Sequence, residues 1–516
     1  MVLPHADLRV LMNAIELSGI DKRFGAVHAN RAVSMAVAKG SIHGIVGENG
    51  AGKSTLMSIL YGFYEADAGD IRVNGDKVRF RSSRDAIAAG IGMVFQHFML
   101  VETFTVLENI LLGAEGGALL GQGRARMRAD ILRLARDYAL EVEPDAVVKD
   151  LSVGLQQRVE ILKALARGSD ILILDEPTGV LTPQEADHLF RILRQLRENG
   201  KTVMLITHKL REIMAITDSV SVMRRGEMVA TLKTADTSPD ELAALMVGRS
   251  VKLRVEKKPA APGAEALRVS RLTVTDERGL NRVDDVSFTL RGGEIVGVAG
   301  VAGNGQSELM EAIAGMRPIA SGEILFNGAA VTRDPQTLRK RGMGHVPEDR
   351  HRTGLVVAFE ACENGILGYQ DAPPCNRGLL LDRDAIVDLA AKRMQAYDVR
   401  PPDPFLRAAA FSGGNQQKIV LAREIEQDPA LLLVGQPTRG VDIGAIEFIH
   451  RRILAMRDAG KAVLLVSVEL DEILSLSDRI LVMCGGKIIG ERNANETNER
   501  DLGLLMAGVD HQATAA

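Results

Sequence analysis

The stretch Gly47-Glu-Asn-Gly-Ala-Gly-Lys-Ser-Thr55 decides the fold of this chain. It follows an apolar run, Ile42 to Val46, and precedes a helix-like pattern from Thr55 to Tyr61, so we expect it to connect a strand to a helix. A G-x-x-x-x-G-K-[ST] loop in that context binds phosphate, because its glycines let several backbone N–H groups face one anion. The helix N-terminus adds the positive end of its dipole.

Two side chains of this loop carry chemistry. We expect Lys53 to bring a point charge to the β- and γ-phosphates, and Ser54 to ligate Mg²⁺. Taken alone, the pattern leaves an ordinary glycine-rich turn as an alternative. The motifs that follow it in the chain argue against that alternative.

Length and composition set the broad class. At 516 residues, 46% of them hydrophobic, the chain should form more than one globular domain. A net charge of -4, with no long Lys/Arg block, argues against nucleic acid as a partner. The three cysteines form no C-x-x-C pair, which suits a reducing compartment and argues against a zinc site. No apolar run approaches the ~18 residues of a membrane span, and the start does not resemble a signal peptide, so we expect a cytosolic protein.

The chain contains a tandem duplication. Lys201 to His208 recurs as Lys461 to Val468, and the loop glycines Gly47 and Gly52 recur as Gly300 and Gly305. A Pro/Ala-rich passage between the copies is typical of a linker. We therefore predict a first domain at 12–250, a linker at 251–266 and a second domain at 267–508. Residues 1–11 are interpreted as an upstream extension.

Each copy alternates short apolar runs with helical patterns. This order favours an α/β fold with a mostly parallel sheet and helices on its faces, that is, two tandem P-loop NTPase domains. Between residues 100 and 165 the strand patterns stop. Met127, Ile131, Leu134 and Tyr138 fall at helical spacing there, which predicts an inserted helical subdomain with these side chains in its core.

Two carboxylates end a buried-strand pattern, Ile171 to Asp175 followed by Glu176. Burying a carboxylate at the end of a strand costs free energy unless it is paired or binds a metal. We expect Asp175 to hold Mg²⁺, and Glu176 to orient and deprotonate the attacking water. A strand followed by a plain acidic turn remains the alternative.

Just upstream, Leu151-Ser-Val-Gly-Leu-Gln-Gln-Arg158 opens a helix that we expect to run to Gly168. Ser152 is a natural N-cap, so a plain capped helix would explain this stretch in isolation. The second copy reads Phe411-Ser-Gly-Gly-Asn-Gln-Gln-Lys418 at the same place. This run resembles the signature motif of ABC-type ATPases.

The resemblance covers nearly the whole chain, and its motifs occur in the family's order. In that family two ATPase domains pair head to tail, here within one chain, and each ATP lies between the phosphate loop of one and the signature helix of the other. The helix N-terminus then offers N–H donors to the γ-phosphate. The resemblance gives Gln96 metal and water contacts and a link to the membrane partner, His208 a γ-phosphate contact, and Phe24 a stacking contact with adenine. Taken singly, His208 and Phe24 would more often be core residues.

The same resemblance implies ATP contacts with Gly47, Asn49, Gly50, Gly52, Lys53, Ser54, Thr55, Ser412, Gly413, Gly414, Gln416 and Asp442. It implies a Mg²⁺ site at Ser54, Gln96 and Asp175, and catalytic roles for Glu176, His208, Gln96 and Lys53. His43, in the strand before the loop, is interpreted as structural.

The second copy departs from the family pattern at most positions of its own nucleotide chemistry. The replacements are Gln306 for Lys53, Gly435 for Asp175, Gln436 for Glu176, Val468 for His208 and Glu348 for Gln96, and no aromatic residue stands near Glu277, the position of Phe24. Losing the base alone should cost about 10²–10⁴ in rate. We therefore expect no useful hydrolysis at this loop.

Head-to-tail pairing would collect these defects at one composite site. The signature that would face the defective loop is the one interrupted by Val153, and Thr182 stands there in place of an aspartate. The complete loop would face the unbroken Ser412-Gly-Gly run and Asp442. The sequence thus predicts one complete and one degenerate site.

A fused pair of ATPase domains with a weakened second site resembles the ATPase subunits of bacterial importers for simple sugars and nucleosides. Leu151-Ser-Val-Gly, Gly303-Asn-Gly-Gln-Ser307, Pro347-Glu-Asp-Arg350 and Gln436-Pro-Thr-Arg-Gly440 look more like the nucleoside branch. This implies two permease subunits, an extracytoplasmic binding protein that selects the cargo, and a peripheral place on the cytoplasmic face of the membrane. A sugar importer remains an alternative, and a soluble tandem ABC ATPase acting on ribosomes or DNA is a remote one.

Overall fold

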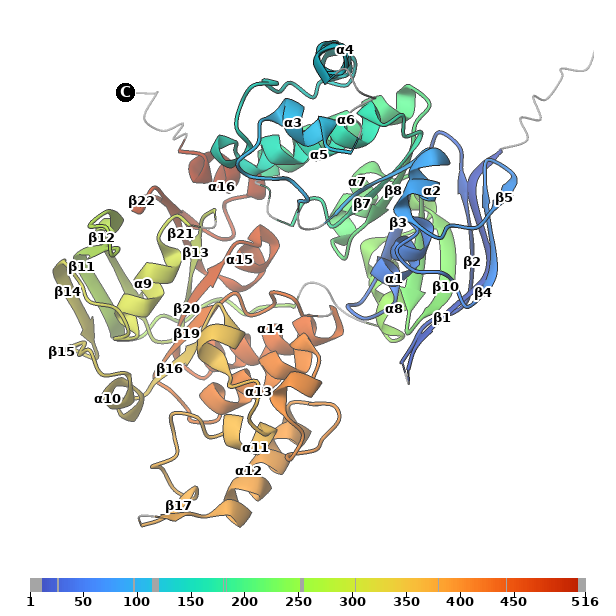
Figure 1. The fold of residues 1–516 in the computed structure, drawn as a ribbon. Coiled ribbons are helices and arrows are strands. Elements are labelled where there is room, and N and C mark those ends of the chain that lie inside the picture. The colour runs from blue at the N-terminus through green and yellow to red at the C-terminus, as the bar shows by residue number, and fades with distance from the viewer. Residues whose placement is uncertain are drawn as a thin grey trace, which may run out of the picture. The chain divides into compact units, whose positions relative to one another are not determined.

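The computed structural model describes residues 12–25, 27–95, 98–113, 120–179, 181, 183–250, 255–301, 303–378, 380–441 and 443–508. The chain divides into two compact units, Met1–Val251 and Lys252–Ala516 (Figure 1). The expected upstream extension, residues 1–11, lies outside the described residues. Strand β11 begins at Glu265, so it includes the last two residues of the linker that the sequence predicts.

A six-stranded sheet in the order β10-β9-β3-β8-β7-β6 forms the centre of the first unit. All its strands run parallel except β10, which pairs antiparallel with β9. The strands are β3 Ile42–Gly47, β6 Ile91–Val94, β7 Ile171–Asp175, β8 Thr202–Ile206, β9 Ser219–Arg224 and β10 Glu227–Lys233. Strands β3, β6 and β8 are buried along their whole length, as expected for parallel strands covered on both faces. This confirms the predicted fold class.

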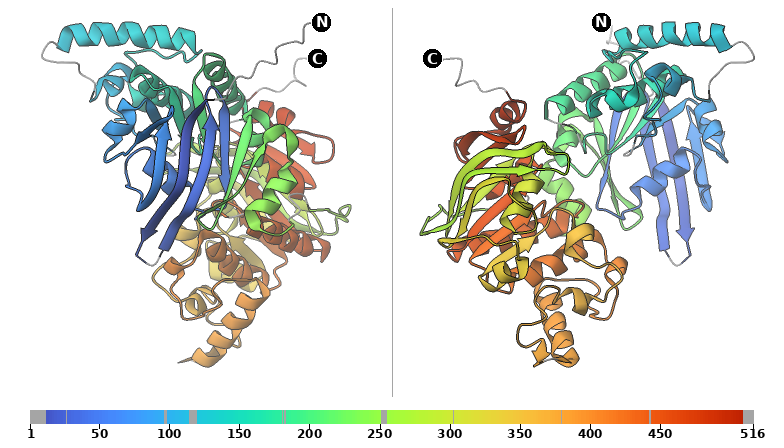
Figure 2. Two further views of the ribbon diagram at one scale, coloured as in Figure 1. Left: turned by 90° about the vertical axis from the view of Figure 1, so that its right-hand side faces the viewer. Right: turned by 60° about the vertical axis from the view of Figure 1, so that its left-hand side comes forward.

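An antiparallel sheet, β2-β1-β4-β5, packs with helix α1 on the main sheet of the first unit. Figure 2 shows its long strands side by side. The strands are β1 Asn13–Phe24, β2 Val27–Ala38, β4 Ala68–Val73 and β5 Asp76–Val78. The helices of this unit are α1 Lys53–Leu60, α2 Ser83–Ala88, α3 Val106–Leu111, α4 Leu120–Asp137, α5 Val153–Ala166, α6 Pro183–Glu198, α7 Leu210–Ile216 and α8 Pro239–Val247.

Helices α3, α4 and α5 form the helical insertion that the sequence predicts. Ile131 and Leu134 of α4 are buried, so they belong to its core. Met127 and Tyr138 are only half-buried, because α4 lies on the outer side of α3 and α5 (Figure 2). The prediction of a core role was therefore right for two of the four side chains.

The second unit repeats this plan. Its main sheet has the order β16-β19-β20-β13-β21-β22, and its antiparallel sheet the order β12-β11-β14-β15. The strands are β11 Glu265–Thr275, β12 Asn281–Arg291, β13 Ile295–Ala299, β14 Ser321–Phe326, β15 Ala329–Ala330, β16 Met343–Val346, β17 Asn376–Arg377, β18 Leu380–Leu381, β19 Leu431–Gly435, β20 Ala462–Ser467, β21 Arg479–Cys484 and β22 Lys487–Asn493.

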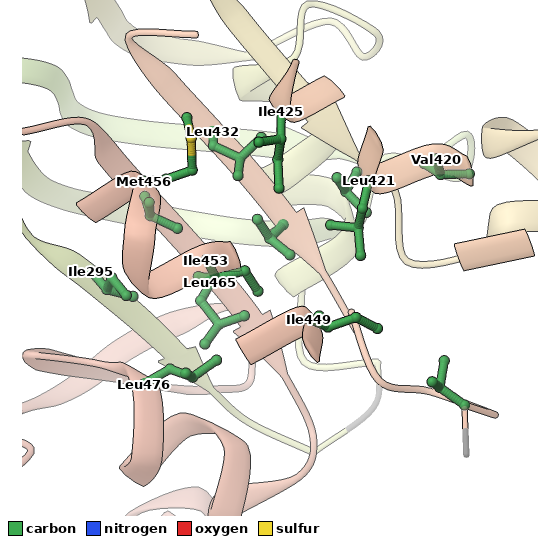
Figure 3. Close-up of a cluster of buried hydrophobic side chains, with 14 of the residues drawn as sticks. Ile295, Val420, Leu421, Ile425, Leu432, Ile449, Ile453, Met456, Leu465 and Leu476 are labelled. Atoms are coloured by element: carbon green, nitrogen blue, oxygen red, sulfur yellow. The ribbon is translucent and has the colours of Figure 1, made fainter. Parts of the chain in front are cut away.

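The helices of the second unit pack on its parallel strands through aliphatic side chains. Figure 3 shows Ile449 and Ile453 against Leu465, part of a core whose labelled members are almost fully buried. The helices are α9 Gln306–Ile313, α10 Pro335–Lys340, α11 Ala361–Asn364, α12 Arg383–Ala396, α13 Gly413–Ile425, α14 Ile443–Asp458, α15 Leu470–Leu476 and α16 Glu499–Met506. Within the described residues, no helix is long and apolar enough to cross a membrane.

His43 is buried within β3, and its contacts are with neighbouring strand residues. Its Nε2 is 2.8 Å from the Ser221 hydroxyl and its Nδ1 is 2.8 Å from the Ser219 hydroxyl. Burial lowers the pKa of His43 from 6.5 to about 4. The unfolded chain therefore binds more protons at this residue between these two pH values, and the stability due to neutral His43 is complete above pH 6.5 and is lost as the pH falls towards 4.

We expect His43→Asn to flatten the loss of stability on acidification. The parent should lose about 2 kcal/mol of unfolding free energy through this residue between pH 7 and pH 5. Urea unfolding at both pH values, followed for parent and variant, measures the difference. Equal losses in the two proteins would contradict the assignment.

Candidate nucleotide-binding site

The loop between β3 and α1 has the backbone that phosphate binding requires. Gly50 and Gly52 have φ values of +79° and +96°, a region that glycine adopts without steric cost. A Cβ on Gly52 would lie 2.3 Å from the Ala29 carbonyl oxygen, so no larger residue fits there. The Lys53 Nζ donates to the carbonyl oxygens of Gly47 at 2.7 Å and Glu48 at 3.0 Å, which holds the loop curled around its own amine.

Lys53 is buried at the start of α1, 6% exposed. Burial lowers the pKa of its amine, and the nearby charges of Glu176, Asp175 and Glu48 act in the opposite direction. A phosphate bound by the loop would add further negative charge beside this amine and so favour its charged form. The loop therefore fits the anionic part of a nucleotide. Asn49, Gly50 and Ser54 are exposed, and Thr55 is half-buried.

Ser54 and Asp175 bring oxygen ligands together. Asp175 ends β7, next to the loop, and its carboxylate is hydrogen-bonded to the Ser54 side chain. Burial, followed by the charge of Glu176, raises the pKa of Asp175. Within the described ranges no three His, Cys, Asp or Glu side chains gather into a metal site. One carboxylate and one hydroxyl instead fit Mg²⁺, which takes its other ligands from phosphate oxygens and water.

Glu176 and His208 form a pair beside these residues. The Glu176 Oε1 is 2.8 Å from the His208 Nδ1. This hydrogen bond is the main cause that lowers the pKa of Glu176, and burial opposes it. Glu176 has a φ of +46°, and its N–H donates to the Ile206 carbonyl at 2.8 Å, which fixes the turn after β7. An ionised carboxylate held in this way can accept a proton from water.

The ring of Phe24, which we expect to contact adenine, is accessible at the surface of the first unit. Phe24 ends β1 and is 41% exposed, so it is not a core residue. Its ring meets Tyr64 edge-on at 5.1 Å between centroids, and the Lys22 Nζ lies 5.5 Å from its centroid. His208, whose side chain is 38% exposed, is not a core residue either. Gln96 and Asp442 lie outside the described residues.

The signature serine of each copy caps a helix. Ser152 accepts a hydrogen bond from Leu155 N before α5, and Ser412 accepts one from Asn415 N before α13, both at 3.4 Å. Ser412 is exposed, Gly413 is half-buried and Gly414 is buried. Gln416 is also buried, and its amide donates to the Ala408 carbonyl at 2.9 Å. The structure thus uses the Gln416 side chain to hold the signature segment within its own unit.

No sequence pattern identifies the residues that support the turn after Asp175 and Glu176. The Gln157 Nε2 donates to the Pro177 carbonyl at 2.7 Å, which ties the signature helix to the turn after Glu176. Thr178 of the same turn is hydrogen-bonded to Glu212 of α7, and burial raises the pKa of Glu212. These side chains sit at ordinary helix and turn positions, so only the folded structure identifies them.

The second copy keeps the shape of the acidic turn without its acids. Gln436 has a φ of +48° and donates its N–H to the Val466 carbonyl at 2.8 Å, as Glu176 does to Ile206. Gly435 ends β19 where Asp175 ends β7. The Gln306 Nε2 donates to the Val301 carbonyl at 3.1 Å, so it folds back onto its loop as Lys53 does.

Comparison with known proteins agrees with this geometry. The sequence profile of the family described as "ABC transporter" matches residues 30–179 and 283–439. The chain is 50% identical to the guanosine import ATP-binding protein NupO of Bacillus subtilis, over 96% of this chain and 97% of that protein. It is 48% identical to the nucleoside import ATP-binding protein NupA of Lactococcus lactis, over 96% and 98%. It is 44% identical to the glucose import ATP-binding protein TsgD13 of Haloferax volcanii, over 97% of each.

Both profile matches coincide with the two copies found in the sequence, and each covers a phosphate loop, a signature helix and the strand that follows. The relatives span almost the whole chain rather than one copy. The chain therefore belongs to the ABC transporter family, as an ATPase with two fused ATP-binding domains.

Proposed function

We propose that this protein is the energy-coupling subunit of an importer, hydrolysing ATP to drive the uptake of nucleosides through partner permeases. The observation that carries the proposal is the Glu176–His208 pair, 2.8 Å apart, beside the loop that holds Lys53. Such an arrangement provides a general base for the attacking water next to a loop that binds phosphate. The cargo rests on the relatives named for guanosine and nucleoside import, which are 50% and 48% identical.

In the first copy, Glu176 takes a proton from the attacking water, and His208 keeps that carboxylate ionised and oriented. Lys53 and the loop N–H groups bind the phosphates. Ser54, Asp175 and Gln96 would hold Mg²⁺, which neutralises charge on the phosphates when bound. Phe24 offers its exposed ring to adenine.

We further propose that the second copy supplies the signature for this site through Ser412, Gly413, Gly414 and Asp442. Support comes from the sequence, in which the unbroken signature belongs to the copy whose own loop has lost its lysine and acidic pair. Donors at the N-terminus of α13 would stabilise charge that develops on the γ-phosphate. The degenerate loop would pair with the signature that Val153 interrupts.

Reconstitution with candidate partners tests the function. We propose two permease subunits and an extracytoplasmic binding protein as partners, and a peripheral position on the cytoplasmic face of the membrane. The proteins encoded beside this chain should co-purify with it, and nucleosides should stimulate its ATPase activity in proteoliposomes. Stimulation by glucose or ribose alone would favour a sugar importer, for which the 44% identical glucose import relative is the motivating observation. Recovery with ribosomes would contradict the proposal.

Gln306→Lys should not create a second active site. The variant restores the loop cation, but Gly435 and Gln436 still provide neither the strand-end carboxylate nor a base for water. We expect phosphate release to stay close to that of the parent. A doubling of turnover would show that the second copy needs only its lysine to hydrolyse ATP.

A further inference from the structure

A π-helical turn, Arg350–Gly354, follows β16 in the second copy. Seven residues separate Glu348 from Val356 there, whereas four separate Gln96 from Val101 in the first copy. The two valines occupy matching positions, because the N–H of each donates to the asparagine eight residues later. Such turns are rare and often lie at functional sites. The turn is therefore an addition specific to the second copy, and its contacts indicate what it does.

The π-helical turn is held at both of its ends. Asp349 precedes it, and the Asp349 Oδ1 accepts hydrogen bonds from the N–H groups of His351 at 2.9 Å and Arg352 at 3.1 Å. At the other end, the buried Arg423 of α13 donates to the Gly354 carbonyl oxygen at 2.8 Å. The turn therefore has a fixed position beside α13, the helix that begins with the signature of the second copy.

The Arg350 side chain connects the signature helix to the turn that follows β19. Its Nε donates to the Gln416 Oε1 at 3.3 Å, and its Nη1 donates to the Arg439 carbonyl oxygen at 2.8 Å. The His351 Nε2 lies 2.8 Å from the same Gln416 oxygen. A guanidinium is planar and presents its donors in a fixed geometry. One side chain therefore sets the position of the signature helix relative to the turn after β19.

The backbone of the signature comes close to this guanidinium. A Cβ on Gly413 would lie 2.6 Å from the Arg350 Nη2 and 2.8 Å from the Gly440 carbonyl oxygen, so a larger residue would push these segments apart. The first copy has Val153 at this signature position. It has Phe98 at the place of Arg350, counted from the end of the preceding strand. The arginine and the unbroken signature thus occur together in one copy.

We propose that Arg350 is a positioning residue for ATP hydrolysis, because it holds the start of the signature helix and the turn before Asp442 in one arrangement. This inference rests on the proposed function, in which both segments serve the ATP bound by the first loop. Donors that stabilise developing charge must be held in place before the reaction, and a displacement of about 1 Å can lower the rate ~10²-fold. Because these donors act mainly on the transition state, kcat should fall more than ATP affinity.

The test uses the full chain assembled with its partner permeases. Arg350→Ala should lower kcat for ATP ~10- to 100-fold, while ATP affinity, measured by equilibrium dialysis, should change less than about threefold. Arg350→Lys keeps the charge but not the forked geometry, so it should also lower kcat, by at least ~5-fold. Arg352→Ala is the matched control, because it removes the same side chain from an exposed position of the same turn. It should hydrolyse ATP like the parent.

Ser412→Arg, measured in parallel, separates this inference from the proposed function. Strong suppression by Ser412→Arg with parent-like kcat in Arg350→Ala would overturn the positioning role and leave the pairing of the two copies intact. No effect of Ser412→Arg would overturn the pairing and this inference with it. A purely structural role would lower the unfolding temperature and leave kcat unchanged. Full activity of Arg350→Lys, which decides the matter if Arg350→Ala folds poorly, or an equal loss in Arg352→Ala would also refute the proposal.

Discussion

Glu176→Gln is expected to lower ATP turnover by about 10²–10⁴, because it removes the carboxylate that we propose takes a proton from the attacking water. An amide has nearly the shape of the carboxylate, and its oxygen can still accept a hydrogen bond from His208. Lys53 and the loop that holds the phosphates are unchanged. The variant should therefore still bind ATP.

Two measurements separate these effects. Phosphate release reports turnover, and equilibrium dialysis of ATP reports binding. Glu198→Gln, an exposed position in α6, is a control for the loss of one negative charge in the same unit and should hydrolyse ATP like the parent. Turnover by Glu176→Gln within threefold of the parent would refute its role as the base.

Ser412→Arg is expected to suppress turnover by about 10²–10³, and Ser152→Arg to have a much smaller effect. The proposed pairing places the N-terminus of α13 against the γ-phosphate held by the first loop, where a donor to developing charge contributes several kcal/mol. A pair of independent ATPase domains would give the opposite result, since Ser412 then belongs to the copy without an active loop.

Both serines cap the helix that follows them, so the effects of the two replacements can be compared. Each accepts a backbone hydrogen bond at 3.4 Å from the third residue of its own helix, and Ser412 also accepts one from the Asn415 side-chain amide at 3.0 Å, so each replacement should cost at least about 1 kcal/mol of local stability. A large difference in turnover between the two variants then reflects the position of each serine relative to the bound ATP and not the loss of a helix cap. Both variants must first show parent-like thermal unfolding and co-purify with the permeases. Equal losses, or a larger loss in Ser152→Arg, would reassign hydrolysis between the copies.

The sequence was a good guide wherever a short motif fixes local geometry. The strand before Gly47, the helix after it and the carboxylate at the end of β7 follow from residue types at fixed spacings. The helix begins at Lys53 rather than at Thr55, because the first turn is polar and carries no apolar pattern. Such boundaries depend on backbone hydrogen bonds that hydrophobic periodicity does not report.

Contacts between distant segments could not be predicted in the same way. The sequence analysis assigns Glu176 and His208 separate roles, but their hydrogen bond depends on β7 and β8 being neighbours. It identified Glu348 only as a replacement for Gln96. That its carboxylate reaches the end of β19 depends on strand order and on the missing side chain at Gly435. Strand order is a property of the whole fold, and no local pattern encodes it.

Gln436 has the same left-handed backbone as Glu176, with φ values of +48° and +46°, although its side chain is an amide and cannot act as a base. A non-glycine residue in this region carries a conformational cost of about 1–3 kcal/mol that the surrounding structure must impose. Since the copy without a base retains that cost, the strain belongs to the scaffold and not to the reaction. At this one position the second copy has the amide that the Glu176→Gln variant would have, so that variant should keep the backbone of the turn.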